Sequence, residues 1–244
     1  MLKRMEAAQL YPVAINRAFS SFINTLIENA GDSAEVLCNK DPLALQYSTW
    51  LQTLFPQAKF IHLVRDGRAV TASMLKRHVK IGKGKLDAYQ TFARWERIVK
   101  NISDQCANTA SCLTIHYEKL VLQPKKTMSR VLEFLHLPWD DSVLNHHNLI
   151  RNRTILSRME PSTSQVIYPI HMEALYTWAS NDSVLSQEFI RNIHKTSAVL
   201  KSLGYAQANI PPNYGAPESS VLERTKHMYN DENFRKIFGR SNRL

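Results

Sequence analysis

The chain has 244 residues and a formal net charge of +10, from 31 Lys and Arg against 21 Asp and Glu. Its hydrophobic content of 44% and charged content of 21% are ordinary for a globular protein that buries a sizeable core. The sequence contains no run of 18 apolar residues, so we expect no segment of it to span a bilayer. Its first residues also lack the apolar stretch of a secretory signal peptide.

The positive charge is concentrated in one part of the chain. Residues 65–100 hold ten Lys or Arg and only three Asp or Glu. A field of this sign attracts anionic partners such as a polyanionic cofactor or an acidic peptide. A solvated basic face and a nucleic-acid surface are the alternatives. Because no nucleic-acid recognition motif accompanies the charge, we expect no nucleic-acid partner.

Strands and helices alternate along the first 136 residues. Strands that alternate with helices pair in parallel, so the predicted fold class is α/β, with a parallel sheet flanked by helices. The strands are short apolar runs, and the helices show apolar side chains at helical spacing. The expected elements are a helix at 12–30, a strand at 35–38, a helix at 43–54, a strand at 58–64, helices at 67–77 and 86–105, a strand at 113–117 and a helix at 124–136.

The last third of the chain is expected to be more helical. Helices are predicted near 172–180 and 183–202, and the second ends at the stop signal Leu-Gly-Tyr of residues 203–205. Residues 211–215, Pro-Pro-Asn-Tyr-Gly, predict an irregular surface strap. No internal repeat or long linker divides the sequence, so we predict a single domain over residues 1–244.

The turn that follows the strand at 58–64 carries the chemistry. Arg65 begins this turn, and Asp66 is expected to accept backbone N–H groups within it. Arg65, Ser73 and Arg77 then gather at one strand end and on the helix that leaves it. Two guanidinium groups and a hydroxyl beside free backbone N–H groups suit a dianionic phosphate. For a lone arginine, a surface ion pair is the alternative.

Six segments in this order resemble the protein-tyrosine sulfotransferases, which use 3′-phosphoadenosine-5′-phosphosulfate (PAPS) as co-substrate. The resemblance extends from about residue 6 to about residue 230. It implies a P-loop-like sulfotransferase fold and transfer of a sulfuryl group to tyrosine in acidic secretory proteins. It also implies a homodimer in the Golgi lumen. Independently of the resemblance, no Cys/His spacing in the sequence indicates a metal site. The six segments are 37–42, 64–69, 116–122, 162–167, 203–205 and 209–215.

The resemblance also assigns roles to residues. Lys40 would stabilise charge on the leaving oxygen, although unaided it reads as a surface loop lysine. Tyr117 would contact the cofactor, with a half-buried strand aromatic as the alternative. Ser162 would lie near the sulfuryl group; on its own it reads as a turn or N-cap residue. The predicted catalytic residues are Lys40 and Ser162, and the predicted cofactor contacts are Arg65, Ser73, Arg77, Tyr117, Ser162, Thr163, Gln165, Val166 and Ile167.

The chain departs from the family pattern in two ways. Pro161, Tyr168 and Thr177 stand where the family usually has Arg, Lys and Lys, which removes three cations from the neighbourhood of a polyanion. None of the seven glycines lies in a strand–loop–helix unit able to cradle a phosphosulfate. The family carries that loop, a central strand, a glutamate base and a membrane anchor before the matched region.

We therefore expect the C-terminal two-thirds of a sulfotransferase that lacks its N-terminal strand and 5′-phosphosulfate loop. A fragment, a mis-predicted gene and a shortened paralogue are the possible origins. The alternative function is a catalytically inactive, truncated paralogue that retains nucleotide or partner binding. Loss of a central strand would expose an apolar sheet edge, which predicts poor solubility of the isolated chain.

Cysteines and sequons bear on the compartment. The family resemblance implies a disulfide between Cys106 and Cys112, as suits an oxidising lumen, and leaves Cys38 free. Free thiols in a cytosolic protein are the alternative. Sequons are weak single indicators of a secretory, glycosylated protein. They begin at Asn101, Asn152 and Asn181.

Overall fold

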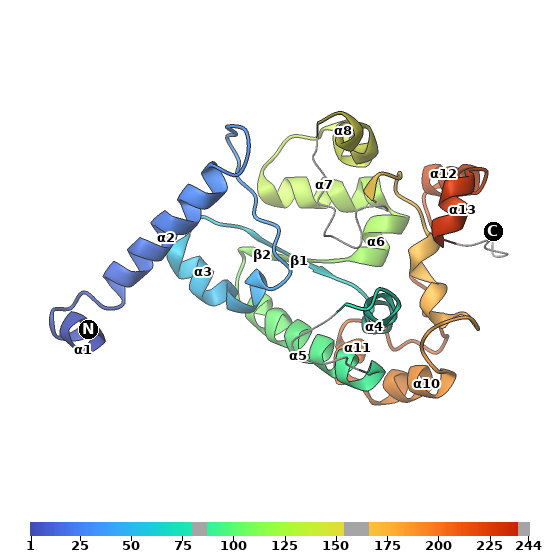
Figure 1. Ribbon diagram of the computed structural model, residues 1–244, viewed down its shortest axis with the longest axis horizontal. Coiled ribbons are helices and arrows are strands. Elements are labelled where there is room, and N and C mark those ends of the chain that lie inside the picture. Colours follow the sequence, from blue (N-terminus) through green and yellow to red (C-terminus); the bar gives the residue numbers. More distant parts are fainter. Residues whose placement is uncertain (80–86, 154–165, 239–244) are drawn as a thin grey trace. The chain divides into compact units, whose positions relative to one another are not determined.

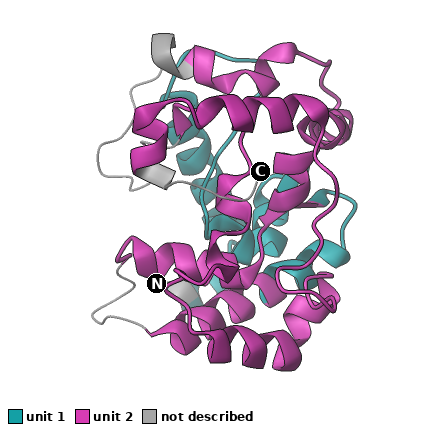
Figure 2. Cartoon of the chain, turned by 90° about the vertical axis from the view of Figure 1, so that its right-hand side faces the viewer, with its two compact units in different colours: residues 1–62, 101–113 teal, residues 63–100, 114–244 magenta. Residues whose placement is uncertain are grey.

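The computed structural model describes residues 1–79, 87–153 and 166–238 (Figure 1). The chain divides into two compact units (Figure 2). Unit 1 consists of residues 1–62 and 101–113, and unit 2 of residues 63–100 and 114–244. Neither unit is a continuous stretch of sequence. The expectation of one sulfotransferase domain over the whole chain stays a prediction.

Unit 1 begins with two helices, α1 (Leu2–Ala7) and α2 (Val13–Glu28), and continues through the 3₁₀ turn η1 (Ala44–Tyr47) into α3 (Ser48–Leu54). Helix α2 confirms the helix predicted at 12–30. Phe19 of α2 packs edge-on against Trp50 of α3, with ring centroids 5.5 Å apart. The Trp50 indole nitrogen also donates a hydrogen bond to Asn16 Oδ1 at 3.2 Å. An aromatic pair and one polar contact therefore join the two helices.

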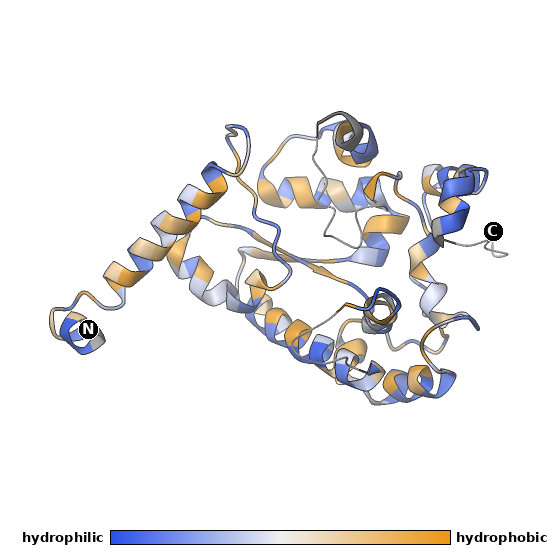
Figure 3. Ribbon diagram, viewed as in Figure 1, coloured by the Kyte–Doolittle hydropathy of each residue, from blue (hydrophilic) through white to orange (hydrophobic). Residues whose placement is uncertain are grey.

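Apolar residues recur along α2 (Figure 3), yet none of its residues is buried. Phe22 is 60% exposed and Leu26 is 56% exposed. Residues 28–43 after this helix are exposed throughout. The strand predicted at 35–38 is absent, so that prediction is wrong. A strand needs a partner for its backbone N–H and C=O groups, and the sheet of the described residues offers none to this segment.

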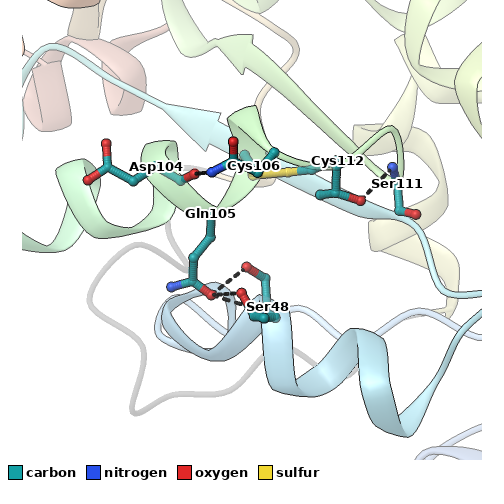
Figure 4. The surroundings of a disulfide bond; sticks show 9 residues. Ser48, Asp104, Gln105, Cys106, Ser111 and Cys112 are labelled. Atoms are coloured by element: carbon teal, nitrogen blue, oxygen red, sulfur yellow. Dashed lines mark hydrogen bonds between the residues drawn. A yellow bond between two sulfur atoms is a disulfide. The ribbon is translucent and has the colours of Figure 1, made fainter.

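Within the described parts of the chain the sheet has two parallel strands, β1 (Phe60–Val64) and β2 (Cys112–His116). The Phe60 N–H donates to Ser111 O at 2.7 Å. Cys106 and Cys112 form a disulfide where the chain enters β2 (Figure 4), which confirms the pairing implied by the family resemblance. Beside it, Gln105 Oε1 accepts a hydrogen bond from Ser48 Oγ at 2.9 Å. Cys38 is an exposed free thiol, as expected.

Helices follow both strands. The helices predicted at 67–77, 86–105 and 124–136 are confirmed as α4, α5 and α7, and α5 extends from unit 2 into unit 1. Pro124 occupies the first turn of α7, where its missing N–H is not needed. The helices of this part are α4 (Gly67–Lys76), α5 (Ala88–Ala107), α6 (Tyr117–Leu122), α7 (Pro124–Leu135), the 3₁₀ turn η2 (Asp141–Leu144) and α8 (His146–Arg153).

The C-terminal part of unit 2 differs from prediction in two places. The helix predicted at 172–180 is two 3₁₀ turns, because the Ala174 carbonyl accepts a hydrogen bond from the Arg65 guanidinium and not from the helix backbone. The helix predicted at 183–202 is split where Ser197 caps a new helix, its Oγ accepting from Leu200 N at 3.1 Å. The elements are η3 (Glu173–Leu175), η4 (Thr177–Ala179), α10 (Gln187–Thr196), α11 (Ala198–Ser202), α12 (Ser219–Met228) and α13 (Glu232–Phe238).

The core of unit 2 is apolar and joins distant parts of its sequence. Leu122, Ile190, Leu200 and Val221 are fully inaccessible to solvent. These residues come from α6, α10, α11 and α12, which pack with the aromatic residues of α5. Among the helices that the structure describes, none combines the length and the apolar character required to cross a membrane.

Candidate functional site

The candidate site lies where the two strands end. Arg65 follows β1 directly, and Tyr117 follows β2 directly. Because parallel strands point the same way, both residues leave the sheet at its carboxyl edge, where α/β proteins bind ligands. The Arg65 guanidinium carbon lies 4.6 Å from the centroid of the Tyr117 ring, a cation–π contact.

The remaining hydrogen-bonding capacity of Arg65 is informative. Its Nη2 donates to Ala174 O at 2.7 Å. Its Nε is buried and has no hydrogen-bond acceptor among the described residues. A buried donor without an acceptor costs about 1–3 kcal/mol. The tyrosine face and the carbonyl therefore hold the guanidinium in place.

Arg77 adds a second cation. It caps the C-terminal end of α4, one helical turn after Ser73. Burial lowers the pKa of Arg77, the nearby positive charge of Arg65 lowers it further, and Tyr117 acts in the opposite direction. These influences place two guanidinium groups and one phenol within electrostatic range of each other. An anion between the two like charges would relieve their repulsion.

The other predicted residues are distributed differently. Lys40 belongs to unit 1, in the exposed segment that precedes η1. The neighbouring Asp41 shapes this turn, because its Oδ1 accepts from the N–H groups of Leu43 at 2.7 Å and Ala44 at 2.9 Å. Ser162, Thr163 and Gln165 lie outside the described residues. The roles of Lys40 and of these three residues stay predictions.

The segment after the undescribed residues packs on an aromatic cluster. Val166 is largely exposed, and Ile167 packs against a cluster formed by Tyr168, Met228 and Phe234. The Tyr168 and Phe234 rings meet edge-to-face, with centroids 5.3 Å apart. Tyr168, a position where the family resemblance led us to expect a lysine, is therefore a core residue of this cluster, 9% exposed. The cofactor contacts predicted for Val166 and Ile167 stay predictions.

A buried ion pair, which the sequence did not reveal, lies directly behind the site. Asp66 and Arg68 are both 0% exposed, and Arg68 Nη2 lies 2.7 Å from Asp66 Oδ2. Asp66 also accepts from the Arg68 backbone N–H at 2.9 Å, which confirms its expected role in the turn. The Tyr214 hydroxyl donates to Asp66 at 3.0 Å, and the Trp178 ring lies 4.4 Å from the Arg68 guanidinium carbon.

A second buried carboxylate extends this network. Glu118 Oε1 accepts from the Asp66 N–H at 2.9 Å, and Oε2 accepts from the Tyr205 hydroxyl at 2.6 Å. Burial raises the pKa of Glu118. Burial also raises the pKa values of Tyr205 and Tyr214, and the Asp66 and Glu118 charges raise them further, so both phenols remain protonated donors. The sequence singled out the segments of these two tyrosines but gave no partner for them.

Comparisons with known proteins agree with this geometry. A sequence profile described as "Sulfotransferase family" matches residues 3–141. Protein-tyrosine sulfotransferase A of Caenorhabditis elegans is 37% identical over 229 residues, which cover 93% of this chain and 60% of that protein. Protein-tyrosine sulfotransferase 1 of Danio rerio is 39% identical, covering 92% of this chain and 64% of that protein. A putative protein-tyrosine sulfotransferase of Caenorhabditis briggsae is 34% identical, covering 87% and 75% respectively.

The chain belongs to the sulfotransferase family. A solved sulfotransferase domain from the Synechococcus PCC 7002 olefin synthase shares its fold, with a TM-score of 0.52 at 22% identity over 76% of this chain and 64% of that one. Within the family, the relatives named above are protein-tyrosine sulfotransferases, as the sequence segments predicted. The chain spans between 60% and 64% of the length of the first two relatives.

Proposed function

We propose that this chain is the nucleotide-binding part of a protein-tyrosine sulfotransferase, which moves a sulfuryl group from PAPS to tyrosine in acidic secretory proteins. The observation that carries the proposal is the contact of Arg65 with Tyr117 at the carboxyl ends of both strands, with Arg77 at the C-terminal end of α4 as a second cation. Two cations and a buried Nε–H group that lacks an acceptor suit the dianionic 3′-phosphate of PAPS. Ser73 lies one turn from Arg77 and adds a hydroxyl donor.

The transfer itself needs few groups. The tyrosine oxygen attacks the sulfur in line, the bond from sulfur to the 5′-phosphate oxygen breaks, and 3′-phosphoadenosine-5′-phosphate leaves. The proton of the tyrosine passes to a base. Charge develops on the leaving phosphate oxygen, where an ammonium group stabilises it best. In this proposal Lys40 supplies that ammonium group, and Ser162 donates a hydrogen bond near the sulfuryl group.

The setting proposed for the whole protein is the Golgi lumen, where it acts as a homodimer. The Cys106–Cys112 disulfide supports an oxidising compartment. The net charge of +10 supports acidic peptide partners and a polyanionic co-substrate, and no nucleic acid.

Calorimetric binding of 3′-phosphoadenosine-5′-phosphate to the purified chain tests the proposal. Micromolar affinity is expected, and Arg65→Ala should weaken it at least tenfold because a charge-assisted hydrogen bond is worth about 1.5–3 kcal/mol. Arg130→Ala, which removes an exposed arginine of α7, is the matched control and should bind like the wild type. Adenosine 5′-phosphate should bind much more weakly. A folded chain that binds both nucleotides equally, or neither, refutes the proposal.

One observation favours an inactive, nucleotide-binding relative as the second candidate. Tyr168, where relatives usually place a lysine, is buried in an aromatic cluster and offers no cation to a polyanion. Transfer of labelled sulfate from PAPS to an acidic tyrosine peptide separates the two. Binding without transfer by the full-length protein supports the second candidate, and transfer supports the first.

A further inference from the structure

We propose that Glu118 and Tyr205 are positioning residues that fix the distance between Arg65 and Tyr117 in the anion site. Arg65 and Tyr117 each lie next to a residue of the buried hydrogen-bond network: Arg65 precedes Asp66, and Tyr117 precedes Glu118. The hydrogen bond from the Asp66 N–H to Glu118 Oε1, at 2.9 Å, joins the two strand exits directly. The inference rests on the proposed function of that site.

The Glu118 carboxylate has a single orientation. Its two oxygens are engaged from opposite partners, the Asp66 N–H and the Tyr205 hydroxyl. The side chain is only 2% exposed, so water does not compete for either oxygen. A carboxylate held at both oxygens cannot rotate without breaking a buried hydrogen bond, and the backbone at the end of β1 is therefore tied to the start of α6.

Tyr205 closes the network from the far side. Its hydroxyl holds Glu118, and its backbone carbonyl accepts from Arg68 Nη2 at 2.9 Å. Gly204 makes this reach possible, because its φ of 77° lies in the left-handed region that favours glycine. The Tyr205 N–H bonds back to Leu200 O at 2.8 Å, which fixes the turn after α11. Tyr205 thus binds the segments that follow both strands: its carbonyl contacts Arg68 after β1, and its hydroxyl contacts Glu118 after β2.

A contribution to stability does not by itself account for this buried polar network. Burying two carboxylates costs free energy that well-packed apolar side chains of the same volume would avoid. Tyr205 and Glu118 are separated by 87 residues, and both are buried. What the polar network supplies is direction: its hydrogen bonds fix the backbone on either side of the site, where the Arg65 guanidinium carbon lies 4.6 Å from the centroid of the Tyr117 ring.

Two conservative substitutions test the inference. Glu118→Gln keeps one acceptor for the Asp66 N–H but replaces the other oxygen by an NH₂ group, so the bond that the Tyr205 hydroxyl donates to a charged carboxylate is lost. Tyr205→Phe removes the hydroxyl only. Both should weaken binding of 3′-phosphoadenosine-5′-phosphate about tenfold, and should change binding of adenosine 5′-phosphate less than twofold. Thr91→Val is the matched control, because Thr91 is buried in the same unit and its hydroxyl donates to Asp87 O at 2.7 Å, away from α11.

A readout without nucleotide separates this inference from the proposed function. The Tyr117 ring current shifts the NMR resonance of the Arg65 Nε–H, which Arg65→Lys identifies by its disappearance. Glu118→Gln and Tyr205→Phe should reduce that shift, whereas Thr91→Val should leave it unchanged. An unaltered shift in both variants, or weakened binding of both nucleotides alike, overturns the inference. If the two variants change the Arg65 Nε–H resonance but the wild type binds no nucleotide, the positioning role of Glu118 and Tyr205 is supported and the proposed nucleotide-binding function is refuted.

Discussion

The close approach of Gly67 to the Trp95 ring allows a quantitative test of how the site helix is seated. Gly67 is the first residue of α4, and Trp95 lies on α5 with 8% of its surface exposed. A Cβ added at Gly67 would lie 2.5 Å from Cζ3 and 2.6 Å from Cδ2 of the indole. Carbon atoms in contact normally lie about 3.5–4.0 Å apart. The substitution Gly67→Ala therefore displaces either the ring or the helix by about 1 Å.

The expected cost follows from two opposing contributions. Overpacking of a core costs about 1–3 kcal/mol, and the upper part of that range applies because the Trp95 ring is rigid and packs against Phe92 with centroids 5.2 Å apart. Alanine is a better helix former than glycine by about 1 kcal/mol. The net destabilisation should be about 2 kcal/mol, which lowers the melting temperature of a chain of this size by about 4–8 °C.

Urea unfolding of four proteins measures the effect: the wild type, Gly67→Ala, Trp95→Leu and the double variant. Leucine has no ring atoms at the contact positions, so Gly67→Ala should cost nothing in the Trp95→Leu background. If Gly67→Ala is as stable as the wild type, or if its cost is the same in both backgrounds, the clash with Trp95 does not exist in solution.

Three further predictions concern buried and surface groups. Burial lowers the pKa of His171 to about 4 from 6.5, so the unfolded chain binds a proton between pH 6.5 and 4 that the folded chain does not. The free energy of unfolding should therefore decrease as the pH is lowered from 6.5 to 4, by at most about 3 kcal/mol. Urea titrations of His171→Gln should show a smaller decrease over the same range. Arg68→Met leaves the buried Asp66 charge unpaired and should cost about 3–5 kcal/mol, measured by urea unfolding, whereas Asp66→Asn combined with Arg68→Met should recover part of that loss. Asn181 lies in an exposed turn, while both amide atoms of Asn101 are hydrogen-bonded within unit 1. In a secreted form, Asn181→Gln should reduce a glycan-dependent gel shift by one glycan, and Asn101→Gln should leave it unchanged.

The sequence predicted the site where local signals and sheet geometry agree. An apolar run followed by a turn predicted β1 and α4, and the family resemblance assigned both Arg65 and Tyr117 to one cofactor; the structure places them in contact at the ends of the two strands. Arg68 and Glu118 gave no such signal, because a charged residue near a helix start normally lies in solvent. Besides its ion pair with Asp66, Arg68 binds the Tyr205 carbonyl 137 residues away, and Glu118 binds the Asp66 N–H 52 residues away. Periodicity does not report contacts at such separations.

The errors in the predicted elements also have tertiary causes. The apolar character of residues 35–38 indicated a strand, but pairing depends on a neighbouring strand that a single segment cannot reveal. The composition of residues 172–180 allowed a helix, but the Ala174 carbonyl is engaged by Arg65. In both cases the local propensity was weak and a distant group, or the lack of one, decided the conformation.

The interleaved course of the chain has a consequence for biosynthesis. Unit 1 needs residues 101–113 to complete it, and the Ser48–Gln105 hydrogen bond joins positions 57 residues apart. A ribosome that has released only the first 62 residues has therefore released an unfinished unit. Closing so long a loop carries an entropic penalty before any contact compensates for it. Nascent chains of intermediate length thus leave α3, whose Ser48 and Leu54 are buried in the finished unit, without these partners for the time needed to synthesise about forty more residues, an interval in which chaperone binding matters most.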